Sequence, residues 1–111
     1  MFAFGNIVLV RFPFTDLSGA KQRPGLVVST DNELRIDLVL CFITSRPLKG
    51  PDMSEVPAVA GTGLKAMSNV RFDKIATLHR SVISGLLGNA PPDWLIAQRR
   101  RFYGVFGFGP D

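Results

Sequence analysis

Histidine and cysteine are nearly absent from this chain, which has one of each among 111 residues. A single histidine excludes a histidine-pair general acid–base mechanism within one chain, and His79 is expected to be a hydrogen-bonding residue at a strand end. A single cysteine excludes an intramolecular disulfide and a thiolate metal cluster. Cys41 lies inside an apolar run and is expected to be a small buried residue rather than a nucleophile.

Other signatures of chemistry are also missing. The acidic residues form no close cluster, so we expect no metal site and no cofactor. The chain has no P-loop and no G-x-S-x-G motif. No apolar segment approaches the roughly 20 residues that cross a bilayer, and no basic segment precedes an apolar stretch at the N-terminus. These absences predict a cytoplasmic protein without a signal peptide or a membrane partner.

The composition favours a folded domain with an anionic partner. Hydrophobic residues make up 46% of the chain, which is enough for a core, and we expect one domain over residues 1–111. Thirteen Lys and Arg against nine Asp and Glu give a net charge of +4. The positive residues are spread along the chain, with one block at residues 99–101, so charge alone does not identify nucleic acid as the partner.

Short apolar runs of strand type recur at close spacing. They occupy residues 7–10, 25–30, 36–44, a short stretch around Val56, 70–78 and 82–87. A helix is expected to begin after Asn89, which can cap it, and to end near Tyr103, before Gly104. The pattern predicts a mainly β (α+β) fold, a small and strongly bent β-barrel with a C-terminal α-helix.

Two of these runs carry polar side chains at one end. Arg23 precedes the second run, whereas Thr44 and Ser45 close the third. If the runs pair in one sheet, a guanidinium and hydroxyls meet at its rim, where they could hold a phosphodiester. RNA supplies its own nucleophile, the 2′-hydroxyl, so such a set could cleave RNA without a metal. The alternative is that Arg23 is a solvated loop residue and Thr44 an ordinary strand end.

Several blocks of the chain resemble the MazF/PemK family in order and spacing. The first blocks are residues 5–10 (GNIVLV), 12–16 (FPFTD) and 23–29 (RPGLVVS). The pattern continues with residues 43–45 (ITS), 63–65 (GLK), Ser68 and 70–75 (VRFDKI). The match covers roughly residues 5–88, and its strongest parts are the Arg-Pro-x-Leu-Val and Arg-Phe-Asp-Lys-Ile blocks.

The resemblance implies an SH3-like β-barrel of the MazF/PemK/CcdB type that forms a homodimer. It also implies the toxin of a type II toxin–antitoxin system, an mRNA interferase that cuts single-stranded RNA at short sequences without a metal. The implied catalytic pair is Arg23 and Thr44, with Ser45 as the alternative. The implied partners are single-stranded RNA and a cognate antitoxin protein.

Five further residues are candidates for binding RNA. Each basic one has a surface salt bridge as the equal alternative, and Phe14 has a core position as its alternative to stacking on a base. The candidates are Phe14, Lys21, Lys65, Arg71 and Lys74.

Two features depart from the family pattern. Asn6 stands where the family has an aspartate, so Arg23 is expected to be held less firmly. Three phenylalanines lie in the last ten residues, where they either cover the barrel or form an apolar docking surface. The second possibility keeps open a CcdB-like toxin that poisons DNA gyrase by protein contact. A catalytically inactive RNA- or protein-binding barrel is a third alternative, because a fold alone does not establish a function.

Overall fold

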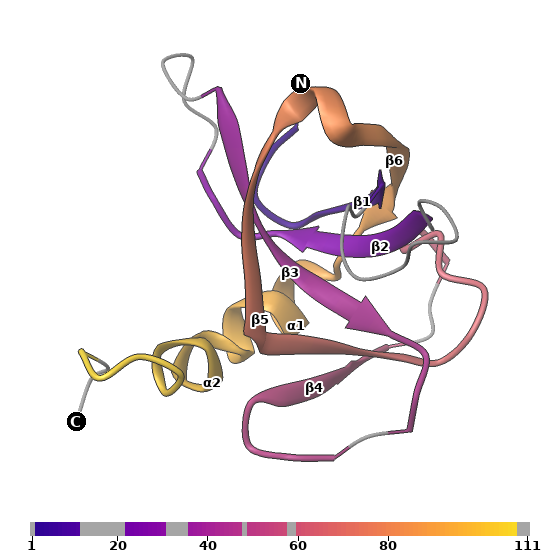
Figure 1. Cartoon of the computed structure of the whole chain (residues 1–111). Coiled ribbons are helices and arrows are strands. Elements are labelled where there is room, and N and C mark those ends of the chain that lie inside the picture. Colours follow the sequence, from indigo (N-terminus) through magenta and orange to yellow (C-terminus); the bar gives the residue numbers. More distant parts are fainter. Residues whose placement is uncertain (1, 12–21, 31–35, 48, 58–59, 109–111) are drawn as a thin grey trace.

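The computed structural model of the protein describes residues 2–11, 22–30, 36–47, 49–57 and 60–108. Within these ranges the chain forms six strands, a short 3-10 helix and two α-helices at the C-terminal end (Figure 1). The elements, in order, are β1 (Asn6–Arg11), β2 (Gln22–Val27), β3 (Asp37–Thr44), β4 (Met53–Val56), β5 (Ser68–His79), η1 (Arg80–Val82), β6 (Ile83–Asn89), α1 (Pro92–Ala97) and α2 (Arg99–Tyr103).

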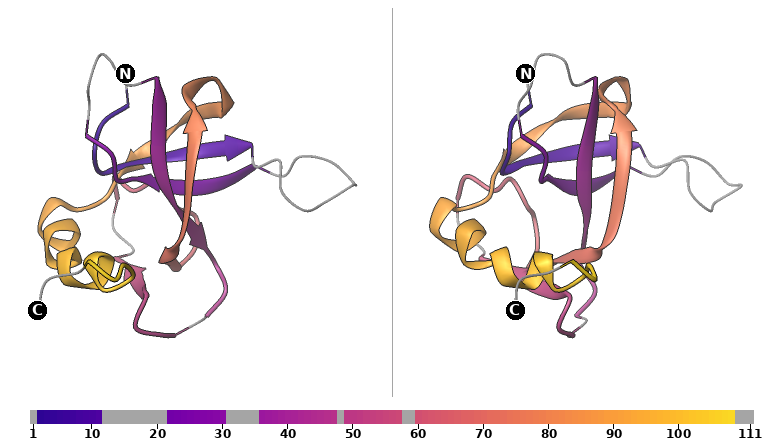
Figure 2. Two further views of the ribbon diagram at one scale, coloured as in Figure 1. Left: turned by 60° about the vertical axis from the view of Figure 1, so that its left-hand side comes forward. Right: turned by 90° about the vertical axis from the view of Figure 1, so that its left-hand side faces the viewer.

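All six strands belong to one antiparallel sheet with the order β4-β5-β3-β2-β1-β6. The sheet is strongly bent, so that β1 and β2 run across the direction of β3 and of the second half of β5 (Figure 2). The predicted mainly β fold with a bent, barrel-like sheet and a C-terminal helical segment is therefore confirmed. The sheet is not closed, because β4 and β6 each pair on one side only.

The long strand β5 turns a corner in its middle (Figure 1). Its first part pairs with β4 and with the end of β3, whereas its second part pairs with the beginning of β3. The register changes between the pairs Phe42↔Arg71 and Cys41↔Ile75, which leaves residues 72–74 without a partner on β3. Extra residues on one strand bend it locally, so this corner produces much of the curvature of the sheet.

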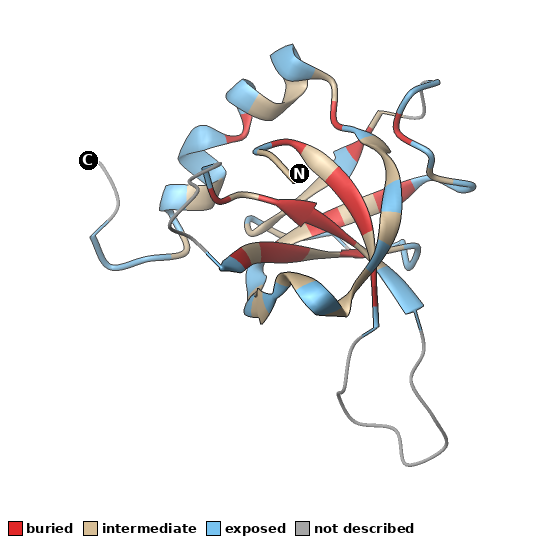
Figure 3. Cartoon of the chain, turned by 90° about the horizontal axis from the view of Figure 1, so that it is seen from above, coloured by how far each residue is buried: buried red, intermediate tan, exposed pale blue. Residues whose placement is uncertain are grey.

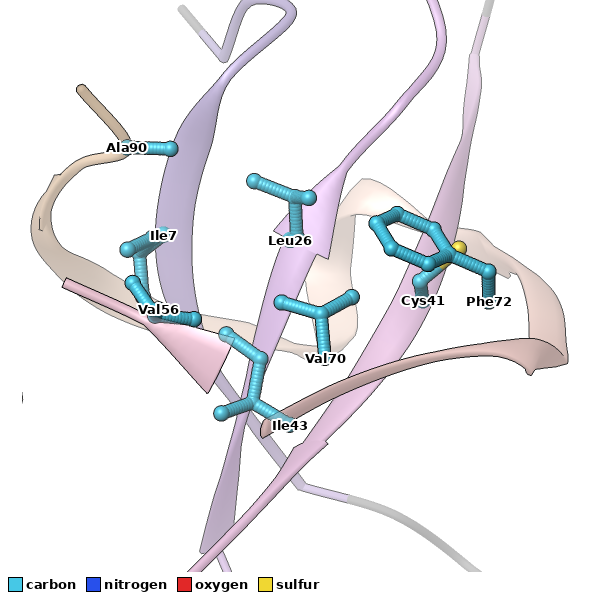
Figure 4. Close-up of a cluster of buried hydrophobic side chains, with 8 residues drawn as sticks. All are labelled: Ile7, Leu26, Cys41, Ile43, Val56, Val70, Phe72 and Ala90. Atoms are coloured by element: carbon cyan, nitrogen blue, oxygen red, sulfur yellow. The ribbon is translucent and has the colours of Figure 1, made fainter. Parts of the chain in front are cut away.

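Two buried clusters lie on opposite faces of the sheet. Neighbouring residues of β2 belong to different clusters, Leu26 to the first and Val27 to the second, because side chains alternate along a strand. Cluster A, shown in Figure 4, contains Ile7, Leu26, Cys41, Ile43, Val56, Val70, Phe72 and Ala90. Cluster B contains Val8, Val10, Val27, Leu38 and Leu40. Full burial of one such side chain stabilises a fold by about 1.5–3 kcal/mol.

The helical segment covers cluster A with its apolar side chains, Trp94, Leu95, Phe102 and the following Val105. Its outward side is exposed, as the blue parts of the two helices show in Figure 3. The expected single helix to Tyr103 is two short ones, separated at Gln98. The Gln98 N–H donates to the Leu95 carbonyl three residues earlier at 3.1 Å, which tightens the turn and interrupts the α-helix.

The predicted helix cap at Asn89 is wrong. Asn89 is the last residue of β6, and its side-chain oxygen accepts a hydrogen bond from Asn6 Nδ2 at 2.6 Å. The helix instead begins after Pro91 without a side-chain cap, and Pro92 occupies the first turn, where no backbone donor is needed. A tertiary contact of Asn89 has replaced the local capping interaction.

The six expected strands all exist, with ends that differ by a few residues from the prediction. The largest difference is at β2, which begins at Gln22 and therefore includes Arg23. None of the helices in the described ranges has the length and apolar character that crossing a membrane requires.

Candidate functional site

Arg23 lies near the start of β2 with its side chain exposed. It is opposite Val10 in the pairing with β1, so its backbone is fixed on that side. On the other side, the pairing of β2 with β3 begins only at Gly25↔Phe42. Pro24 has no N–H to donate to a ladder, which is consistent with the end of the pairing at this point. Among the described residues, the edge of β2 at Arg23 therefore has no strand partner on the side of β3.

The alignment of β2 and β3 relates Arg23 to Thr44. Gly25 on β2 is opposite Phe42 on β3, and this is the last pair of the two strands on that side. Continuing the same antiparallel register by two residues on each strand leads to Arg23 on β2 and Thr44 on β3. Side chains two residues apart share a face of a strand. Arg23 and Thr44 are thus directed to the face of Phe42, at the rim of the sheet.

The hydroxyl of Thr44 is part of a tight turn at the end of β3. Thr44 is half-buried, and its Oγ1 accepts a hydrogen bond from the Arg46 N–H at 3.2 Å. A threonine hydroxyl has one hydrogen to donate in addition to its acceptor sites, so this bond leaves the donor of Thr44 available. Asn69 Nδ2 donates to the Arg46 carbonyl at 3.2 Å, which holds the turn from β5. Ser45 is exposed and lies beyond the strand, in the intervening position of this turn.

Two transverse rows of residues define the face that carries Thr44. In the first row, Thr44 on β3 is opposite Asn69 on β5, which is opposite Glu55 on β4. Directly opposed residues of antiparallel strands point to the same side of a sheet. The first row therefore joins a hydroxyl, an amide and a carboxylate across three strands.

The second row lies next to the first and contains Arg71. Phe42 on β3 is opposite Arg71 on β5, which is opposite Met53 on β4. The guanidinium of Arg71 forms a bidentate pair with Asp73, with Nε–Oδ1 and Nη2–Oδ2 distances of 3.1 and 2.7 Å. The hydrogen bond from Arg71 lowers the pKa of Asp73, and the same bond raises the pKa of Arg71. The surface salt bridge considered as the alternative for Arg71 is present.

The other predicted RNA-binding residues are distributed differently. Lys74 is exposed in the corner of β5, where it has no partner on β3, and Lys65 is exposed in the loop before β5. Phe14 and Lys21 lie outside the described residues. The structure thus brings Arg23, Thr44 and Arg71 to one face of the sheet, whereas the strand pairing does not align Lys65 or Lys74 with them.

Asn6, which replaces the aspartate of the family pattern, orders the first turn of the chain. Its Oδ1 accepts from the Ala3 N–H at 2.6 Å, while its Nδ2 donates to Asn89. A carboxylate could not make the second bond, because it has no hydrogen to donate. Among the residues described, no hydrogen bond joins Asn6 to Arg23.

The single cysteine and histidine have structural roles. Burial raises the pKa of the Cys41 thiol to about 12, so the thiolate is not formed at neutral pH. His79 Nδ1 accepts from the Ser81 N–H at 3.1 Å and caps η1, as expected for a hydrogen-bonding residue at a strand end. Within the described ranges, no group of three His, Cys, Asp or Glu side chains is arranged to hold a metal ion.

Asn69, Glu55 and Arg46 are residues of this surface that the sequence analysis did not single out. Alternation along each strand could have shown that Asn69 shares a face with Arg71, and Glu55 with Met53. Local sequence contains no sign of which residue of β5 or β4 is opposite Thr44, because register depends on pairing between distant segments.

An apolar groove lies apart from this surface, between the helical segment and the sheet. Its volume is about 230 Å³, and Phe4, Val28, Phe72, Leu95, Ile96, Gln98, Arg99, Phe102 and Tyr103 line it. Phe102 packs edge to face against Phe72 and Phe106, with centroid distances of 6.2 and 5.3 Å. Phe108 is 99% exposed beyond this cluster. The aromatic tail thus both covers the core, through Phe102, and extends outward.

Comparisons with solved structures identify proteins of the same fold. An endoribonuclease from a mycobacterial species, solved in complex with its cognate antitoxin, superposes with a TM-score of 0.83 over 100% of both chains at 18% identity. MazF of Deinococcus radiodurans gives a TM-score of 0.77 at 25% identity, covering 96% of this chain and 97% of the other. A MazE–MazF structure from Deinococcus radiodurans gives 0.72 at 29% identity, covering 96% of each chain.

Comparison of sequences is decisive at the level of the family. No curated protein sequence matches the chain. The model of the PemK-like, MazF-like toxins of type II toxin–antitoxin systems, however, matches residues 3–104. This match spans almost the whole chain, and the chain has the fold of solved MazF proteins. The protein therefore belongs to the PemK-like, MazF-like family of type II toxins.

Proposed function

We propose that this toxin is a metal-independent endoribonuclease that cuts single-stranded mRNA at short sequences by attack of the RNA 2′-hydroxyl. The observation that carries the proposal is the alignment of β2 and β3, which directs Arg23 and Thr44 to one face at the open rim of the sheet. Membership of the MazF-like family and the endoribonucleases among its structural relatives support the same reaction.

The proposed chemistry needs only these two side chains and solvent. The 2′-oxygen attacks the adjacent phosphorus, its proton passes to solvent, and the bond from phosphorus to the 5′-oxygen breaks. The products are a 2′,3′-cyclic phosphate and a 5′-hydroxyl that takes up a proton. Arg23 binds two phosphate oxygens and stabilises the crowded phosphorane, while the Thr44 hydroxyl donates to one of them.

Charge and aromatic groups around this pair are proposed to hold the RNA strand. The net charge of +4 favours a polyanion. Phe14, Lys21, Lys65 and Lys74 remain candidates for contacts with a base or the backbone. Arg71 binds Asp73 through Nε and Nη2, and the remaining N–H donors of its guanidinium could contact a phosphate.

Partners follow from the family. We propose that the toxin forms a homodimer and that a cognate antitoxin binds it. The relatives solved as toxin–antitoxin complexes from mycobacteria and Deinococcus radiodurans support the antitoxin as a partner. Messenger RNA as the substrate assigns the reaction to the cytoplasm. Regulation by the antitoxin would be needed wherever the active toxin meets cellular RNA.

One observation favours a second candidate function, a gyrase poison that acts by protein contact as CcdB does. The helical end carries exposed apolar side chains that could dock on a protein, namely Ile96, Tyr103, Phe106 and Phe108. Under this alternative, deletion of residues 104–111 abolishes toxicity and Arg23→Ala does not. A catalytically inactive barrel would fold normally and cleave no RNA.

The test is cleavage of a long single-stranded RNA by the purified protein in excess chelator. Fragments with uniform ends in cyclic phosphate are expected, and Arg23→Ala should lower the rate by roughly 100- to 1000-fold, the usual cost of removing a donor to a transition-state oxyanion. Arg99→Ala is the matched control, because it removes one exposed charge from α2. Activity that survives Arg23→Ala, or that requires a metal ion, would refute the mechanism.

A further inference from the structure

Glu55 holds an unusual position on the surface that carries Thr44. The first transverse row places its carboxylate two strands from Thr44, with Asn69 between them. Strands lie about 4.8 Å apart, so the row spans about 10 Å from Thr44 to Glu55. Glu55 is too distant to share the phosphate bound at Thr44, and it is close enough to meet a base attached to that phosphate or to the next one.

Within the part of the chain that the structure describes, no cation neutralises the charge of Glu55. Its side chain is exposed, and no ion pair or hydrogen bond joins it to any residue that the structure describes. Arg71, the cation of the adjacent row, is bound to Asp73. A free carboxylate on a surface that binds a polyanion repels the phosphates, unless it accepts hydrogen bonds from the ligand.

We propose that Glu55 recognises a guanine base beside the cleaved phosphodiester, an inference that rests on the proposed nuclease function. Guanine presents two parallel donors on its Watson–Crick edge, the N1–H and the N2 amino group. A carboxylate accepts both at once. Adenine and cytosine each offer a single amino group next to an acceptor nitrogen, which a carboxylate repels, and uracil offers one N–H between two carbonyls. Single-stranded RNA leaves this edge free for such contacts.

Asn69 lies between Thr44 and Glu55 and presents an amide oxygen on the same face. Its Nδ2 donates to the Arg46 carbonyl, which directs the amide nitrogen toward the turn. The amide oxygen, the second polar atom of this half-buried side chain, accepts no hydrogen bond from the described residues. The row therefore offers a hydroxyl donor at the phosphate and acceptor oxygens toward the base, a polarity that matches a phosphate followed by the donor edge of guanine.

The experiment compares the sequences cut by the wild type and by Glu55→Gln. Both proteins are incubated with an RNA pool of random sequence, and the new ends are sequenced. The wild type is expected to require guanine at one fixed position near the cut. Glu55→Gln should reduce that preference by roughly 5- to 150-fold, the range for loss of a bidentate contact to a base. Glu55→Ala should relax the same position to all four bases.

Asp93→Asn is the matched control, because it removes an exposed carboxylate at the start of α1. Loss of a negative charge alone strengthens RNA binding for every sequence alike, so a uniform change in rate in both variants would refute the assignment of Glu55. An unchanged guanine preference in Glu55→Gln, or a wild-type cleavage site without guanine, also overturns it while leaving the nuclease function intact. If the wild type cuts no RNA in the pool, the proposed function itself has failed.

Discussion

The two faces of β3, β5 and β4 differ sharply, although their residues are direct neighbours in the sequence. Ile43 and Val70 are 3% and 0% exposed and belong to cluster A beneath the helices. Thr44 and Asn69, one residue away on each strand, form the polar row on the other face. Because side chains alternate along a strand, the end of β3, the start of β5 and β4 pack into cluster A on one face and present the candidate site on the other. Cluster B, with Leu38 and Leu40, lies further along β3 on the face of the site.

Stability and activity can therefore be changed separately at this end of the sheet. Substitutions on the cluster A face should lower the free energy of unfolding, with little effect on the rate of a molecule that is still folded. Substitutions of the polar residues in the row of Thr44 should slow the reaction, with little effect on the free energy of unfolding. Three predictions test this separation, in order of decreasing effect.

The largest expected effect is on the face of cluster A. Phe72 is 1% exposed and packs against Phe102, so Phe72→Ala should lower the free energy of unfolding by about 3–5 kcal/mol. Urea denaturation followed by tryptophan fluorescence measures the change. Phe4→Ala is the control, because Phe4 is 46% exposed and should cost far less. Equal losses in the two variants would show that cluster A is not the main core.

The second prediction concerns Thr44 on the polar face. Thr44→Val keeps the shape of the side chain and removes its hydroxyl, so RNA cleavage should slow by roughly 100- to 1000-fold. The melting temperature should fall only slightly, because the hydrogen bond that is lost, from the Arg46 N–H, is exposed and water can replace it. Thr44→Ser should retain most of the rate. If Ser45→Ala proves as harmful as Thr44→Val, the catalytic hydroxyl belongs to Ser45 instead.

The smallest expected effect is the pH dependence of the pair formed by Arg71 and Asp73. The lowered pKa of Asp73 means that its pairing stabilises the fold fully above the ordinary carboxyl pKa. This stabilisation is lost as the pH falls through the lowered value. Both side chains are partly exposed, so solvent screening limits the contribution to less than about 1 kcal/mol.

Chemical denaturation at a series of pH values between about 2 and 7 measures this contribution. This range extends to both sides of the ordinary pKa of a carboxyl group. The difference in stability between the wild type and Asp73→Asn should shrink toward zero at the acidic end. Asp37→Asn, at an exposed position of β3, serves as the control. A difference that persists at low pH would mean that Asp73 acts through something other than its charge.

The sequence was sufficient to predict that the six strands exist, because an apolar run lies within or beside each of them, but not where each strand begins and ends. It also identified Arg23 and Thr44 as the polar ends of two such runs. It could not predict that Glu55 and Asn69 lie in line with Thr44. That relation depends on the corner of β5, which is produced by pairing with two different strands and has no local signature.

Local rules also failed where distant groups compete for the same side chain. Asn89 has the character of a helix cap, but its oxygen is bound to Asn6, more than eighty positions earlier in the chain. The interruption at Gln98 contains neither proline nor glycine. Its side chain donates to the Trp94 carbonyl at 3.1 Å and accepts from Arg101, so the turn is closed by side-chain bonds that propensities do not describe.

The corner of β5 has a consequence for the synthesis of the toxin. Until this strand has left the ribosome, β3 and β4 have no partner to join them, and Thr44 faces neither Asn69 nor Glu55. The row that joins Thr44 to Asn69 and Glu55 is therefore completed only when most of the chain has been translated. The contact proposed to read a base thus forms later in synthesis than the pairing of β2 with β3 that aligns Arg23 and Thr44.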